Sequence, residues 1–83
     1  MTHRVFWAPD ADESLQEIIL TSEDRESTLR RVREIDFWLA RNPLEFGESR
    51  EDAVRIGVVT PLVVLFEVLD DPPTVIVMAI RRI

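Results

Sequence analysis

The sequence contains no cysteine, no tyrosine and no lysine, and it has one histidine and two glycines among its 83 residues. Without cysteine, the chain cannot form disulfides, zinc ribbons, iron–sulfur sites or a thiol nucleophile. Without lysine, it also lacks a lysine base and a Schiff-base residue. We therefore assign no cofactor and no metal, and a small chain without disulfides indicates a reducing, cytoplasmic location.

Long hydrophobic runs are absent as well. The longest, residues 75–80, is far too short to span a bilayer, and residues 1–7 lack the apolar stretch of a signal peptide. The hydrophobic share of 46% and the low glycine content exclude a disordered chain. A chain of this length forms one domain, residues 1–83, with a stability of roughly 4 to 12 kcal/mol.

Positive charge is scarce relative to negative charge. Ten basic residues, all arginine, stand against sixteen acidic ones, which gives a net charge of −6. Such a chain repels phosphate backbones, so the electrostatic footprint of a nucleic-acid-binding protein is missing. The charge balance favours a protein partner.

Hydrophobic periodicity predicts six elements. Strands are expected at residues 3–7, 54–59, 62–69 and 74–80, and helices at residues 10–20 and 23–41. The polar segment 44–52, LEFGESRED, has no period and is predicted to be a surface loop. This order predicts an α+β class, a two-layer βααβββ fold in which two helices pack on one face of a mainly antiparallel four-stranded sheet.

Two helices can cover only one face of that sheet, and the strands are apolar on both. We expect Glu67 on the open face, because an unpaired buried carboxylate is costly. The expected register puts Val54, Ile56 and Val58 under the helices and leaves Arg55 on the open face opposite Glu67. In the last strand, it puts Ile76, Met78, Ile80 and Arg82 on the open face.

An open apolar sheet face usually marks an interaction site, so we expect a partner to cover it. The partner is either a segment of another protein or a second copy of the chain. The predicted partner-binding residues share this face and are Val63, Leu65, Glu67, Ile76, Met78 and Ile80.

Three stretches carry a resemblance to a known family. The chain opens with VFWAPDADESLQEI, an apolar strand that passes through Ala-Pro into an acidic helix. It continues with IDFWLARNPLEFGESR, a helix that ends at Asn-Pro before a glycine, and with RIGVVTPLVVLFEVLDDPPTVIVMAIRR, a hairpin, an acidic turn and a last strand. In this order, over nearly the whole chain, they resemble the RelE/ParE superfamily of type II toxin–antitoxin toxins.

The resemblance implies a RelE-like toxin fold, a role in plasmid stabilisation and a cognate antitoxin as partner. Members of the superfamily either cleave ribosome-bound mRNA or poison DNA gyrase. Members that cleave mRNA usually carry an arginine near the start of the penultimate strand. They also usually carry a histidine, arginine or tyrosine near the C-terminus. Here Val63 occupies the first position, and the chain has no tyrosine.

The catalytic candidates that the resemblance leaves are Arg55 and Arg82, with Arg50 and Arg81 nearby. For Arg55, the residues allow two interpretations, a phosphate clamp or an ion pair with Glu67. The valine at position 63 and the absence of tyrosine depart from the members that cleave mRNA. They favour a toxin-like protein that acts by protein binding, with reduced or absent mRNA cleavage. The alternatives are a non-catalytic interaction module of the same fold and an active ribosome-dependent mRNA interferase.

Overall fold

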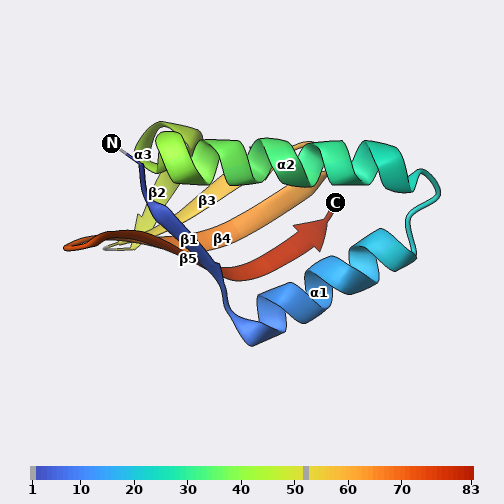
Figure 1. The fold of residues 1–83 in the computed structure, drawn as a ribbon, viewed down its shortest axis with the longest axis horizontal. Helices are drawn as coiled ribbons and strands as arrows, with labels where there is room; N and C mark the ends of the chain where they lie inside the picture. The colour runs from blue at the N-terminus through green and yellow to red at the C-terminus, as the bar shows by residue number, and fades with distance from the viewer. Residues whose placement is uncertain (1, 52) are drawn as a thin grey trace.

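Figure 1 shows the fold in a computed structural model that describes residues 2–51 and 53–83. The elements follow in the order β1 (Arg4–Trp7), α1 (Pro9–Leu20), α2 (Arg25–Arg41), α3 (Pro43–Phe46), β2 (Gly47–Glu51), β3 (Val54–Val59), β4 (Leu62–Asp70) and β5 (Pro73–Arg82). They form one sheet in the strand order β1-β5-β4-β3-β2. Strand β1 runs parallel to β5, and the other neighbours are antiparallel. The predicted α+β class with helices packed against the sheet is confirmed.

The two long helices begin and end where local chemistry requires. Pro9 stands at the start of α1, where its missing N–H costs nothing. The Asp24 carboxylate accepts a hydrogen bond of 3.1 Å from the Ser27 backbone N–H and caps α2. Asn42 ends α2, and Pro43 after it begins the short helix α3. No helix in the described ranges is long and apolar enough to cross a membrane.

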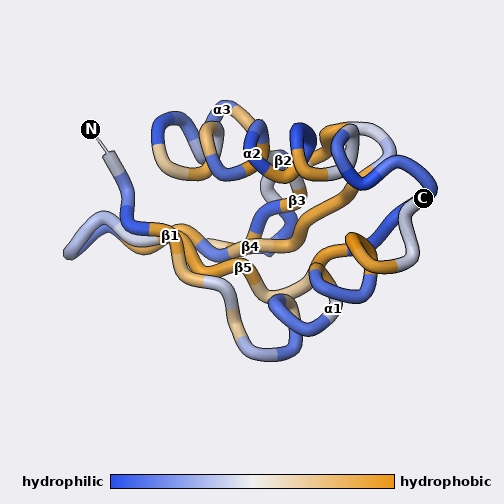
Figure 2. The backbone as a smooth tube through the Cα atoms, turned by 45° about the vertical axis from the view of Figure 1, so that its right-hand side comes forward, coloured by the Kyte–Doolittle hydropathy of each residue, from blue (hydrophilic) through white to orange (hydrophobic). Residues whose placement is uncertain are grey.

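The hydrophobic core lies between the helices and one face of the sheet. One buried cluster joins both long helices to β4 and β5, and it comprises Ala11, Val32, Ile35, Leu39, Leu62, Val64, Phe66, Val68, Val75, Val77 and Ile80. In Figure 2, β4 and β5 are hydrophobic along most of their length, whereas α2 alternates between hydrophobic and hydrophilic residues. The strands therefore carry more apolar surface than the helices cover.

The segment predicted to be a loop contains α3 and the edge strand β2, so the prediction of a four-stranded sheet was wrong by one strand. The two glycines of the chain explain this pairing, because Gly47 of β2 lies directly opposite Gly57 of β3. A Cβ atom at Gly47 would meet the ring of Phe66, and one at Gly57 would meet the ring of Phe46. These rings stack with centroids 6.0 Å apart. Residue 52, at the end of the predicted loop, lies outside the described residues.

A hydrogen bond ties β1 to α2. The Trp7 indole Nε1 donates to the Asp36 carboxylate over 3.3 Å. Burial raises the pKa of this carboxyl, and the hydrogen bond from Trp7 offsets the rise only in part. Because the folded state then binds the proton more readily than the unfolded state, ionised Asp36 costs stability at neutral pH. This cost disappears once the pH falls below the ordinary value of 3.8 and the group is neutral in both states.

We therefore expect Asp36→Asn, which keeps an acceptor for Trp7, to be slightly more stable than the parent at pH 7. The gain is small because much of the residue is exposed to solvent. It should shrink toward zero as the pH falls to about 4, the ordinary range of an aspartate. Urea denaturation at several pH values measures this, with Glu34→Gln on the exposed side of α2 as control. A difference independent of pH would contradict the assignment.

Candidate functional site

The candidate site is the face of the sheet opposite the helices, which we call the open face. Residues paired across neighbouring strands point to the same side, so the register identifies its members. Glu67 pairs with Ile76 and with Val54, and Leu65 pairs with Ala79 and with Ile56. On β1, Phe6 pairs with Ile76 and is 53% exposed. The predicted partner-binding residues Val63, Leu65, Glu67 and Ile76 do lie on this face.

The side chains of strand β3 point to the opposite faces of the sheet from those predicted. Residues Val59 and Leu62 pair across a two-residue turn, and this even-length connection places Arg55 opposite Phe66, which is fully buried. Arg55 therefore points to the helix side. The residues expected under the helices, Val54, Ile56 and Val58, lie on the open face instead, and Val58 is 50% exposed.

The surroundings of Arg55 show what its side chain does. Its Nη2 donates to the backbone carbonyls of Leu44 and Gly47, over 2.8 and 2.7 Å. These carbonyls lie in α3 and at the start of β2, so the guanidinium fixes the chain where it passes from helix to edge strand. Both interpretations drawn from the sequence required Arg55 on the open face beside Glu67, and that placement was wrong.

Strand β5 changes sides near its end. The pairing passes from Phe66 with Val77 to Leu65 with Ala79, so Met78 is an extra residue between two pairs. Such a bulge reverses the alternation for the residues that follow. Ile80 is accordingly buried in the core, 3% exposed, and its predicted place on the open face was wrong. Met78 itself is partly buried at the bulge.

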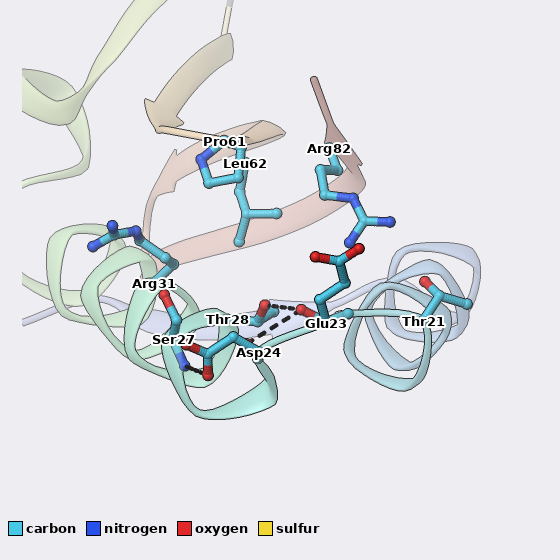
Figure 3. Close-up of a pocket in the computed structure, with 10 residues that line it drawn as sticks. Thr21, Glu23, Asp24, Ser27, Thr28, Arg31, Pro61, Leu62 and Arg82 are labelled. Atoms are coloured by element: carbon cyan, nitrogen blue, oxygen red, sulfur yellow. Dashed lines mark hydrogen bonds between the residues drawn. The ribbon is translucent and has the colours of Figure 1, made fainter.

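The same shift exchanges the sides of the sheet on which Arg81 and Arg82 lie. Arg82 pairs with buried Leu62 and therefore lies on the helix side, whereas Arg81 pairs with Val63 on the open face. Arg82 lines a surface pocket of about 380 Å³ beneath the connection between α1 and α2. Figure 3 shows its side chain pointing toward Glu23 there. The predicted location of Arg82 on the open face was wrong, and Arg81 occupies the place expected for it.

The structure does not bring the two catalytic candidates together. Arg55 and Arg82 pair with Phe66 and Leu62 of β4, four residues apart, which corresponds to about 13 Å along the strand. One phosphate group cannot contact both side chains while Arg55 binds the Leu44 and Gly47 carbonyls. Their role in catalysis stays a prediction from the resemblance.

At the centre of the open face lies a shallow apolar pocket of about 270 Å³. It is lined by Ile56, Val63, Leu65, Ala79, Arg81 and Ile83. Ile83 is 78% exposed beside it. Arg81 is the only charged side chain among these residues, so the pocket suits an apolar side chain of a protein partner better than a phosphate.

The lone histidine lies away from the open face. His3 precedes β1 at the sheet edge, and its backbone N–H donates to the Ala40 carbonyl over 2.7 Å. Its Nδ1 is buried against the protein. His3 therefore lies at the edge of the sheet, against the end of α2.

No protein-family model matches the sequence, and no curated protein matches it. Solved structures do match. A chain of the toxin–antitoxin complex RelBE2 from Mycobacterium tuberculosis matches with a TM-score of 0.80 and 18% identity over 100% of both chains. A chain of the chromosomal ParDE system from P. aeruginosa matches with a TM-score of 0.71 and 17% identity, over 99% of this chain and 97% of that one.

A chain of the archaeal RelE–RelB complex from Pyrococcus horikoshii matches similarly, with a TM-score of 0.70 and 16% identity over 99% of this chain and 96% of that one. The three complexes come from two bacteria and an archaeon. The resemblance to the RelE/ParE superfamily is thus confirmed at the level of the fold.

Proposed function

We propose that this chain, which shares its fold with components of RelBE and ParDE complexes, is the toxin-like member of a type II toxin–antitoxin pair. It acts by binding protein, and its mRNA cleavage is weak or absent. The observation that carries the proposal is the open face, which is apolar at its centre and offers Arg81 alone beside the central pocket. Its cytoplasmic location and its role in plasmid stabilisation are part of the same proposal.

Cleavage of a phosphodiester needs a base at the 2′-hydroxyl and cations at the same phosphate. On the open face, Arg4, Glu48 and Glu51 lie on the edge strands β1 and β2. On β4 and β5, the acid–base candidate is Glu67 and the cation is Arg81. Their rows are separated by the apolar row of Leu65 and lie about 13 Å apart along β4, so they cannot act on one bond. This separation supports protein binding over RNA cleavage.

The partner is a cognate antitoxin, because the structures that share the fold are toxin–antitoxin complexes. An apolar antitoxin segment laid across the open face would bury the shallow pocket around Leu65. Among the cellular targets implied by the resemblance, DNA gyrase is a protein and needs no phosphate chemistry. Ribosome-bound mRNA is the alternative target.

The test is induced expression of the chain with and without the small open reading frame beside its gene. We expect growth arrest without the neighbour, relief with it, and co-purification of the two proteins. Leu65→Arg should weaken co-purification by about 100-fold, as expected when a charge enters an apolar contact. Leu20→Arg, on α1 and outside the open face, is the matched control, since Leu20 is already 65% exposed.

Primer extension on mRNA from the same cells distinguishes the two mechanisms. We expect no new 5′ ends during growth arrest. New ends at defined codon positions that disappear in Arg81→Ala, Arg55→Ala or Arg82→Ala would overturn protein binding as the mechanism. Absence of both toxicity and co-purification would favour a non-catalytic interaction module with another partner.

A further inference from the structure

On β4 and β5, the open face carries two opposite charges at equal distances from an apolar row. Arg4, Glu48 and Glu51 lie on the edge strands β1 and β2 of the same face. Three of the rows that cross β4 and β5 are Val63 with Arg81, Leu65 with Ala79, and Glu67 with Ile76, and a fourth, Leu69 with Thr74, lies beyond the Glu67 row. The middle row is apolar on β5, β4 and β3, where it continues into Ile56, and it ends in Glu48 on the edge strand β2. Along β4, the rows of Arg81 and Glu67 each lie two residues from the middle row, which is about 7 Å.

This arrangement is complementary to itself. Rotating a copy by 180° about a line along the Leu65 row turns its open face toward the first copy and exchanges the two outer rows. Arg81 of one copy then faces the Ile76 and Glu67 row of the other, and the reverse holds. The apolar middle rows face each other at the centre.

We propose that a second copy of this chain covers the open face, so that the free protein is a symmetric dimer packed sheet against sheet. Each interface contains two Arg81–Glu67 pairs, one on either side of an apolar centre of Leu65, Ala79 and Ile56. Sheets pack face to face about 10 Å apart, a distance that long arginine and glutamate side chains can bridge.

Charge complementarity selects a second copy as the occupant. The net charge of −6 opposes association of two copies in general, so an attractive pair must orient the contact. Arg81 and Glu67 supply that pair twice by symmetry. A nucleic acid would instead meet the Glu67 carboxylate and a face whose centre is apolar.

The size of the face sets the strength of the dimer. Four strand spacings of about 4.8 Å and six residues of about 3.3 Å give a face of roughly 20 by 20 Å. Two such faces bury about 800 Å² in total, which is below the usual range of specific interfaces, so we expect a weak dimer with a dissociation constant of roughly 100 µM. The dimer is independent of the proposed function, and an antitoxin bound to the open face would compete with it.

Sedimentation velocity of the purified chain, from about 1 to 500 µM, tests the proposal. We expect a dimer in the upper part of this range. Glu67→Arg and Arg81→Glu should each weaken self-association by at least about tenfold, because each places like charges opposite one another. Glu26→Arg, an exposed change on α2, is the control and should leave self-association unchanged.

Mixing the two single variants gives the decisive result. Glu67→Arg carries an arginine in both outer rows of β4 and β5, and Arg81→Glu carries a glutamate in both. Neither should self-associate, but an equimolar mixture should form a heterodimer, which misfolded variants could not do. The variant with both substitutions should also dimerise.

A parent chain that is monomeric at 500 µM, or a mixture that stays monomeric, overturns the proposal. Single variants that each dimerise as strongly as the parent would also overturn it. The outcome is separable from the antitoxin experiment, since a monomeric chain that still binds its antitoxin would overturn the dimer alone.

Discussion

Phe66→Ala is expected to cost about 3 to 5 kcal/mol of unfolding free energy, the usual effect of removing a buried aromatic ring. Phe66 is fully buried, and its ring stacks on Phe46 and fills the space above Gly47. The contacts join β4 to α3 and β2, which lie much earlier in the sequence. A chain of this size has roughly 4 to 12 kcal/mol of stability, so the variant should be partly or wholly unfolded.

Urea denaturation followed by circular dichroism measures the loss. Phe37→Ala is the matched control, because Phe37 is the same residue type but is 51% exposed on α2. We expect the control to lose less than about 1 kcal/mol. Equal stabilities of the two variants would show that the aromatic cluster under β2 and β3 does not hold the fold together.

Arg55→Ala is expected to destabilise the fold by about 2 to 4 kcal/mol, since two hydrogen bonds from a charged donor are lost and their acceptors stay behind. The acceptors are the Leu44 and Gly47 carbonyls. The loss should be concentrated where α3 leads into β2, and backbone amide signals of residues 44–51 should broaden or shift. Arg55→Lys should recover only part of the stability, because an ammonium group does not reproduce the guanidinium geometry.

Arg50→Ala is the control for this experiment, because Arg50 lies exposed on β2. We expect it to change stability by less than about 0.5 kcal/mol. The opposite pattern, an Arg55→Ala variant of unchanged stability that loses mRNA cleavage, would restore Arg55 as a catalytic residue. Stability and activity therefore have to be measured on the same preparation.

The open face connects these results to function. An exposed apolar sheet face usually marks an interaction site, so we expect a partner to cover Leu65 and its neighbours. The proposed antitoxin and the proposed second copy use the same surface and exclude each other. If both proposals hold, release of the antitoxin would be coupled to self-association of the free chain, and the fraction of dimer would fall as antitoxin is added.

The sequence by itself determined the α+β class and six of the eight elements in the described residues. Helical spacing of Val32, Ile35 and Leu39 predicted the buried stripe of α2, and alternation in β4 predicted its buried and open sides. The Asp-Pro turn placed Ile76 on the open face with Glu67, and the structure has it there. These features follow from local periodicity and local turn chemistry, which the sequence displays directly.

Only the tertiary structure decided which side three arginines face. Alternation along a strand has a period of two, so a shift of one residue moves every following side chain to the other face. The even turn between Val59 and Leu62 turned Arg55 toward the helices, and the extra residue Met78 exchanged Arg81 and Arg82. The polar strand β2 shows no strand periodicity of its own and pairs because two glycines admit the rings of Phe46 and Phe66. Contacts of this kind depend on packing between distant segments, which a local pattern does not encode.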